Sequence, residues 1–223
     1  MAVFTQKVEI ILVVDRSGSL ERYYEYLKRA ISDMLNAIKN DPHLSGCDVY
    51  FTFITFASKM DDIKINAVPI SNVNLDDLSF QCQGTTNPGP ALKIAAETAI
   101  SRYYQWKNSG EDAFHPLLVF FTDGYPYPEE KYMGDYDEAA AYIKNLVGIQ
   151  KILAVCGGFG STVVENLEKL TDPRLIVQIN DGNVDKLSRF FMELIPRTVT
   201  THTQTKTDTL QQVADLFTFF NAS

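Results

Sequence analysis

Residues 8–19 read VEIILVVDRSGS, and this stretch decides the fold. Its first part, 8–14, is almost continuously apolar and rich in β-branched side chains, which is typical of a strand buried on both faces. The polar loop DRSGS at 15–19 follows directly. Apolar residues then recur at helical spacing over 24–38. A buried strand, a polar loop and an amphipathic helix in this order predict the first unit of an α/β sheet.

The rest of the chain repeats this alternation of strands and helices. Further strands are predicted at 49–56, 63–68, 117–121, 152–155 and 175–179. Further helices are predicted at 91–106, 137–147, 162–170 and 184–195. The short strand at 63–68 is expected to lie antiparallel at an edge. We therefore predict a doubly wound, mainly parallel sheet flanked by helices, with one antiparallel edge strand.

The composition changes near the end of the chain. From Arg197 onward threonine is frequent and core periodicity is absent. We expect one domain over residues 1–197. Residues 198–223 are expected to be a threonine-rich linker or tail, in which 213–220 could form a short helix.

Charge and cysteine content exclude several classes of function. The 223 residues carry a formal net charge of −8, which argues against nucleic acid and anionic lipid as partners. The cysteines lie far apart in the sequence and suggest no disulfide framework: Cys47, Cys82 and Cys156. The first residues lack the pattern of a signal peptide, and no apolar run reaches the roughly 18 residues of a membrane helix. We therefore expect a cytoplasmic protein that binds no membrane.

Three short polar segments carry the candidate chemistry. Each follows a predicted strand or precedes a predicted helix: Asp15-x-Ser17-x-Ser19, Thr85-Thr86 and Thr122-Asp123-Gly124. Loops at the carboxyl ends of the strands of a doubly wound sheet converge, so Asp15 and Asp123 are expected at one edge. Two carboxylates and several neutral hydroxyls form the all-oxygen donor set that Mg²⁺ prefers. We predict a divalent-metal site with one position open to an outside oxygen ligand.

Each segment alone also has an ordinary structural interpretation, as a turn or a helix cap. The glycine-rich stretch at 157–161 could cradle a phosphate but is better explained as a tight strand-to-helix turn. Cys156 is expected to be a small buried residue rather than a nucleophile, because no histidine lies near it in the sequence. The tyrosines of 125–136 could form a rim around the metal or cover apolar surface, and the sequence leaves both open.

Jointly, the three segments resemble the metal-ion-dependent adhesion site of the von Willebrand factor A domain. The resemblance covers about residues 8–195. It rests on the loop at 15–19 after an apolar strand, a Gly-Thr before a helix that starts with Pro-Ala-Leu, and a Phe-Thr-Asp-Gly after another strand. Further stretches resemble the bacterial TerY-like branch of tellurite-resistance and stress proteins. They are HPLLV at 115–119, TDGYP at 122–126 and LTD at 170–172.

The resemblance implies a metal shell of five side chains: Asp15, Ser17, Ser19, Thr86 and Asp123. Two adjacent threonines are candidates for the threonine ligand. Thr86 lies at the family's distance from Ala91-Leu92 and is preferred, whereas a count from the preceding glycine selects Thr85. The ion is expected to be Mg²⁺, with Mn²⁺ or Ca²⁺ as alternatives. Arg16 could lie near the metal and weaken its binding, or could meet the acidic ligand.

The same resemblance implies a binding module whose metal captures an Asp or Glu side chain of a protein partner. The TerY-like stretches suggest a bacterial stress-response assembly with kinase-like and phosphatase-like proteins. The alternative is a metal-dependent phosphotransferase or phosphatase with Asp15 as its nucleophile. Such a phosphatase typically carries a second aspartate two residues later, where this chain has Ser17. We therefore expect no enzymatic activity, and we expect Asp15 to lie in a surface loop that the fold does not need.

Overall fold

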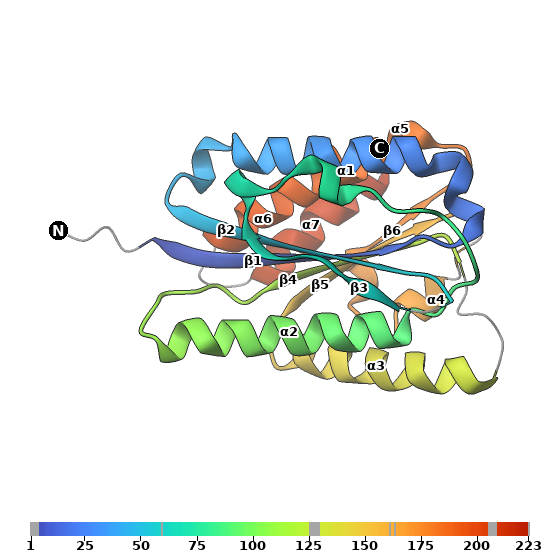
Figure 1. Cartoon of the computed structure of the whole chain (residues 1–223). Coiled ribbons are helices and arrows are strands. Elements are labelled where there is room, and N and C mark those ends of the chain that lie inside the picture. The colour runs from blue at the N-terminus through green and yellow to red at the C-terminus, as the bar shows by residue number, and fades with distance from the viewer. Residues whose placement is uncertain are drawn as a thin grey trace.

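A six-stranded sheet with the strand order β3-β2-β1-β4-β5-β6 forms the centre of the molecule (Figure 1). The computed structural model describes residues 5–58, 60–124, 130–160, 162, 164–204 and 209–222. The strands are β1 (Gln6–Asp15), β2 (Cys47–Phe56), β3 (Met60–Pro69), β4 (Leu117–Thr122), β5 (Leu153–Phe159) and β6 (Ile176–Ile179). Neighbouring strands pair in parallel except β2 and β3. The predicted fold class is confirmed.

Helices cover both faces of this sheet (Figure 1). The α-helices are α1 (Tyr24–Lys39), α2 (Gly89–Asn108), α3 (Glu130–Gly148), α4 (Val164–Leu167), α5 (Val184–Arg189), α6 (Ile195–Gln204) and α7 (Thr209–Ala222). Short 3-10 turns are η1 (Gly18–Tyr23), η2 (Pro42–Leu44), η3 (Ile70–Asn72), η4 (Leu75–Leu78) and η5 (Pro173–Leu175), and a π-helical turn, η6 (Phe190–Leu194), joins α5 to α6. None of the helices in the described part of the chain combines the length and apolar character needed to cross a bilayer.

The apolar run in β1 is explained by its position between two layers of helices. Successive side chains of a strand point to opposite faces. Val8, Ile10, Leu12 and Val14 belong to the core beneath α1, α5, α6 and α7. Ile11 and Val13 belong to the core beneath α2 and α3. Since β1 also pairs with β2 and β4, its carboxyl end is fixed from every side.

The end of the chain differs from the expected linker. Residues 198–204 continue α6 and 209–222 form α7, while 205–208 lie outside the described residues. Val199 and Phe217 are fully buried in the core. The expectation of a linker is therefore wrong for these two helices, whereas the short helix expected at 213–220 is present as part of α7.

The two buried threonines of α6 fit a buried helix because their hydroxyls bond to backbone oxygens one turn back. The hydroxyl of Thr198 donates to the backbone oxygen of Leu194 over 2.8 Å. The hydroxyl of Thr203 donates to the backbone oxygen of Val199 over 3.1 Å. A threonine that bonds one turn back in this way gives its own buried hydroxyl a partner.

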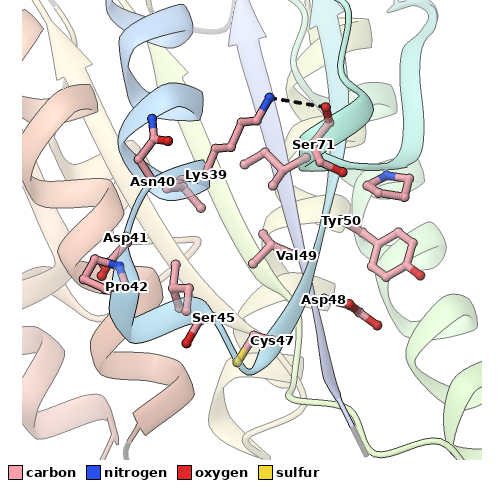
Figure 2. A pocket seen from close by; sticks show the side chains of 14 residues that line it. Lys39, Asn40, Asp41, Pro42, Ser45, Cys47, Asp48, Val49, Tyr50 and Ser71 are labelled. Atoms are coloured by element: carbon pink, nitrogen blue, oxygen red, sulfur yellow. Dashed lines mark hydrogen bonds between the residues drawn. The ribbon is translucent and has the colours of Figure 1, made fainter. Parts of the chain in front are cut away.

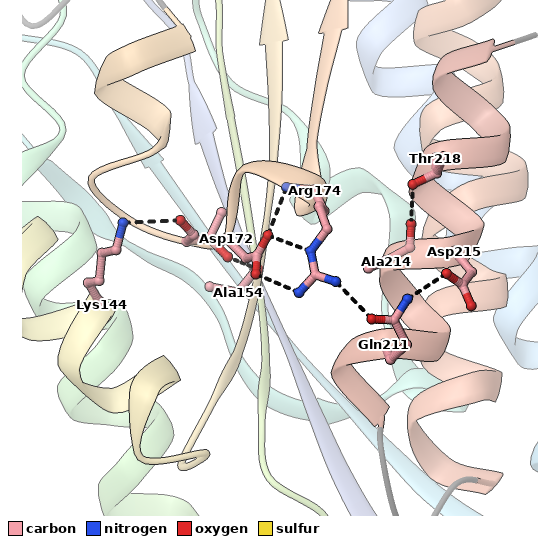
Figure 3. A network of polar contacts seen from close by, with 9 residues as sticks. Lys144, Ala154, Asp172, Arg174, Gln211, Ala214, Asp215 and Thr218 are labelled. Atoms are coloured by element: carbon pink, nitrogen blue, oxygen red, sulfur yellow. Dashed lines mark hydrogen bonds and ion pairs between the residues drawn. The ribbon is translucent and has the colours of Figure 1, made fainter.

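Polar contacts attach α7 to the rest of the fold (Figure 3). Arg174 in η5 donates to both carboxylate oxygens of Asp172 and to the side chain of Gln211 in α7. Near the other end of the helix, the Asn221 side chain donates to the backbone oxygen of Ile176 over 3.0 Å. The last helix is therefore attached to η5 and β6 near both of its ends.

Candidate metal centre

Two aspartates lie at the carboxyl ends of neighbouring strands. Asp15 is the last residue of β1, and Asp123 directly follows β4. The two strands pair in parallel, with Val14 opposite Phe121. The chain leaves β1 toward β2 on one side, while β4 lies on the other side, so the strand order reverses here. In open α/β sheets the crevice at such a point is where ligands bind.

The first loop brings two serines to Asp123. The hydroxyls of Ser17 and Ser19 lie 3.2 Å and 3.0 Å from Oδ1 of Asp123, within donating distance, and 3.0 Å from each other. Ser17 is buried and Ser19 is exposed. Gly18, between them, donates its N–H to the backbone oxygen of Gly84 over 3.1 Å. This bond joins the first loop to the second.

Asp15 is fully buried beneath these loops. Its carboxylate accepts hydrogen bonds from the N–H of Ser17 (2.7 Å) and from the hydroxyl of Thr122 (2.6 Å). The N–H of Gly124 donates in turn to the Thr122 hydroxyl over 3.2 Å. The expectation that Asp15 lies in a surface loop is therefore wrong, because β1 ends inside the core.

The two threonines of the second loop face different surroundings. Thr86 is buried against the third segment, and a Cβ built on Gly124 would come within 2.7 Å of its hydroxyl oxygen. Thr85 is exposed and turns to Ser58, whose hydroxyl accepts from the Thr85 N–H over 2.8 Å. The structure thus brings Thr86, and not Thr85, to the segment that carries Asp123.

Arg16 contacts the stretch of chain that leads to Thr86. Its Nη1 donates to the backbone oxygen of Gln81 over 3.1 Å. Its own backbone oxygen accepts from the N–H of Gln83 over 2.8 Å. The side chain is largely buried. The structure thus shows Arg16 connecting the first and second loops, a role that the sequence did not suggest.

Burial governs the protonation of both aspartates. Burial, and after it the charge of Asp123, raises the pKa of Asp15 to about 7, although hydrogen bonds from Thr122 and Ser17 act in the opposite direction. Burial also raises the pKa of Asp123, against hydrogen bonds from Ser19 and Ser17. Two carboxylates that share a buried space repel each other, and a divalent cation between them would relieve this repulsion.

The donor set fits a hard divalent ion. Within the described ranges, no three His, Cys, Asp or Glu side chains gather as a metal-binding group, so an ion here would depend on hydroxyls as well as carboxylates. Two carboxylates with three serine or threonine hydroxyls offer only oxygen atoms. That chemistry suits Mg²⁺ better than the softer metals that favour sulfur and nitrogen.

Two threonines behind the aspartates support the site, and neither was expected to do so. The hydroxyl of Thr122 bonds Asp15, as described above. The hydroxyl of Thr162 donates to the backbone oxygen of Thr122 over 3.0 Å. Thr122 stands inside the third segment, so its place in the motif could have marked it. Nothing in the sequence around Thr162 does so.

The glycine-rich stretch and Cys156 serve packing. β5 continues through Phe159, so Gly157 lies in the strand and the expected turn is wrong at this position. A Cβ on Gly157 would come within 2.9 Å of the rings of Phe121 and Phe190, which explains the glycine without a phosphate. Cys156 is fully buried, as predicted, and burial raises the pKa of its thiol.

Of the tyrosines in 125–136, only Tyr136 has a side chain within the described residues. Tyr125 and Tyr127, and the side chain of Tyr132, lie outside the described residues. Tyr136 is buried in α3, and its hydroxyl donates to the backbone oxygen of Asn166 over 2.5 Å. Tyr136 therefore covers apolar surface and belongs to no aromatic rim.

A hollow of about 500 Å³ lies at the other end of the sheet (Figure 2). The end of α1 and the start of β2 line it, with Lys39, Asp41, Cys47 and Tyr50 among its side chains. Lys39 reaches across it to the backbone oxygen of Ser71 over 3.4 Å. None of the five predicted metal ligands lines this hollow, so it is separate from the candidate metal centre.

Comparisons with solved structures agree with this architecture. Proximal thread matrix protein 1 from the mussel byssus is similar with a TM-score of 0.58 and 14% identity, over 86% of this chain and 46% of that chain. The SpRpn10 VWA domain is similar with a TM-score of 0.55 and 13% identity, over 82% and 95%. The manganese-loaded TRAP protein of Plasmodium vivax is similar with a TM-score of 0.50 and 15% identity, over 84% and 74%.

Likeness at such low identity shows the fold alone, and this chain spans less than half the length of the mussel protein. No curated protein matches the sequence. The family model of the von Willebrand factor type A domain, however, matches residues 9–193, which is most of the chain and includes all three polar segments. The chain therefore belongs to the von Willebrand factor type A domain family.

Proposed function

We propose that this chain is a metal-dependent protein-binding module without a catalytic step. One observation carries the proposal: oxygen-bearing side chains from three loops meet where the strand order of the sheet reverses. They are Asp15, Ser17, Ser19, Thr86 and Asp123. Membership of a family whose domains often act as metal-dependent interaction modules supports it.

These side chains would hold one divalent ion, with Mg²⁺ expected and Mn²⁺ or Ca²⁺ as alternatives. The hydroxyls are neutral ligands, so only Asp15 and Asp123 offset the ion's two charges, and they balance them at most. A bound ion would supply a local positive centre that accepts one outside oxygen. The similarity to a manganese-loaded TRAP structure supports a divalent ion in this fold.

The partner is proposed to present an Asp or Glu side chain to this centre. The chain carries a net charge of −8, so an acidic partner is repelled overall and only a local positive charge can reverse this. Asp15 and Asp123 are 0% and 8% exposed, so the attraction acts in a crevice where water screens it less than at a surface. Losing the contact should cost several kcal/mol, enough to remove a micromolar complex.

The cellular setting is a further part of the proposal. The TerY-like stretches favour a bacterial stress or tellurite-resistance assembly with kinase-like and phosphatase-like proteins as partners. The three free cysteines fit the reducing conditions of the cytoplasm. Genes for such partners beside this one would support this setting, and their absence would count against it.

Direct titration with Mn²⁺ tests the metal site. We expect one saturable site in the wild type and none in Asp15→Asn, which keeps an acceptor for its hydrogen bonds but lacks the charge. Asp137→Asn is the matched control, because Asp137 is an exposed carboxylate on α3 that pairs with Lys169. Without a metal, Asp15→Asn should be at least as stable as the wild type, since carboxylate repulsion is relieved. Equal binding by all three proteins would reject the site.

A pull-down tests the partner. The wild type in Mg²⁺ is compared with the wild type in EDTA and with Asp123→Ala, followed by substitution of acidic residues in the captured proteins. We expect capture only by the wild type in Mg²⁺. Retention of the same partners at equal strength under all conditions would show that the metal is not the contact.

A further inference from the structure

The loop after β6 touches η1, the turn that carries Ser19. Asp181 in that loop accepts two hydrogen bonds from Arg22, each 2.9 Å long. It accepts another from the hydroxyl of Tyr23. Arg22 and Tyr23 end η1, and Ser19 lies near its start. One carboxylate therefore fixes the turn that places a proposed metal ligand.

The loop that bears Asp181 is itself held against the end of β5. The N–H of Gly160, directly after β5, donates to the backbone oxygen of Ile179, the last residue of β6, over 2.9 Å. The ring of Tyr23 packs edge-on against Phe159, with 4.7 Å between the ring centroids. Asp181 therefore accepts its hydrogen bonds from η1 in a loop that is itself held against the end of β5.

Arg22 brings a positive charge close to the candidate metal centre. Arg22 lies three positions after Ser19 in η1, and the Ser19 hydroxyl lies 3.0 Å from Oδ1 of Asp123. A positive charge on this turn repels a divalent ion held beside Ser19 and Asp123. Asp181 pairs with this guanidinium, which lies 4.7 Å from the centre of the Tyr23 ring. The pairing offsets a charge that would otherwise oppose metal binding.

We propose that Asp181 is a positioning residue of the metal centre: it holds η1 in place and compensates the Arg22 charge beside the proposed ion. The inference rests on the proposed metal-binding function. Asp181 lies outside the three polar segments and acts on the site through Arg22 and Tyr23. The Arg22 and Asp181 side chains are 66% and 55% exposed, so their ion pair should contribute little to folding stability. Its loss should therefore change metal affinity more than stability.

The test is the Mn²⁺ affinity of the full chain, measured by titration calorimetry at low salt. Asp181→Asn removes the charge but keeps an oxygen that can accept from Tyr23. Asp137→Asn breaks the similarly exposed ion pair with Lys169 and is the matched control. We expect Asp181→Asn to bind Mn²⁺ roughly three- to tenfold more weakly than the wild type, and the control to bind as the wild type does. Both variants should unfold within about 4 °C of the wild type.

A second substitution separates charge from general damage. In Asp181→Asn/Arg22→Gln the uncompensated charge is gone, so the affinity should recover toward that of the wild type. The deficit of the single variant should also shrink as salt is added. The inference is overturned if Asp181→Asn binds as tightly as the control, or if the double variant binds no more tightly than the single one. A wild-type chain without saturable Mn²⁺ binding would reject the proposed function itself, and this inference with it.

Discussion

Adjacent residues of the same type can differ completely in role, as Thr85 and Thr86 show. Thr86 is buried beside Gly124, whereas Thr85 bonds Ser58 at the surface. Spacing within the motif favoured Thr86, and the structure supplies the packing reason. Glycine is needed at position 124 because a Cβ there would strike the Thr86 hydroxyl.

We therefore expect Thr86→Val to weaken Mn²⁺ binding by roughly tenfold or more, since an isosteric methyl replaces a donor oxygen beside a charge. Thr85→Val is the matched control and should change the affinity by less than about twofold. Titration calorimetry of both variants provides the comparison. Equal losses would mean that the conformation of the second loop matters, and not the Thr86 hydroxyl.

Glu9 is a buried acid far from the metal loops. It lies in β1, is 1% exposed, and accepts a hydrogen bond from the hydroxyl of Thr52 over 2.6 Å. Arg102 Nε lies 3.4 Å from its other oxygen. Burial raises the pKa of Glu9 from 4.5 to about 7, although Thr52 and Arg102 act in the opposite direction.

Because its folded pKa lies above its unfolded pKa, the protonated form of Glu9 favours the folded state. This contribution is complete below the unfolded value of 4.5 and is lost as the pH rises through about 7. Glu9→Gln should therefore be more stable than the wild type at pH 8, by up to roughly 3 kcal/mol, and the difference should vanish near pH 4. Urea unfolding across this range in EDTA measures it. A difference that does not change with pH would show that Glu9 does not titrate in this range.

At the scale of elements, α7 has one face in the core and one face outside. Phe217 is fully buried, and Phe219, two positions later, is 71% exposed. We expect Phe217→Ala to lower the free energy of unfolding by roughly 3–5 kcal/mol. Phe219→Ala should lower it by less than about 0.5 kcal/mol. Denaturant titrations of the two variants measure this, and small losses in both would mean that α7 is dispensable for the fold.

The sheet could be predicted because its signals are local. The apolar run of β1 and the helical periodicity of α1 are both visible within a single segment. The helix α6 is different, because threonine has a low helix propensity and only the sheet and the helices packed on it make the burial of α6 favourable. Of the helix expected at 162–170, the described residues show only Val164–Leu167 as helix.

In the candidate site, too, some residues could be predicted from the sequence and others could not. Its five predicted ligands stand in short motifs that follow strands or precede helices, so the sequence could propose their convergence and the structure brings them together. The supporting residues Thr162 and Asp181 act from other loops. No motif marks them, because their role depends on the distance between segments far apart in the sequence.

At the scale of the whole molecule, we expect no turnover of phosphate esters or nucleotides. The position that carries the second aspartate in phosphatases of this kind holds Ser17, whose hydroxyl is a poor proton donor. The measurement is a phosphatase assay with Mg²⁺ on rigorously purified protein, with Asp15→Asn beside it. Hydrolysis by the wild type that disappears in Asp15→Asn would contradict the expectation.

The direction of β1 also determines where the protein can be immobilised without covering its polar loops. Its ten residues run from Gln6 to Asp15, a length of roughly 30 Å, so the beginning of the strand and the polar loops lie at opposite ends of the sheet. A biotin or a resin attached ahead of Gln6 would leave those loops pointing away from the support. Immobilised in this way, the protein would meet candidate partners with its loops outermost, which is the orientation that a biosensor surface requires.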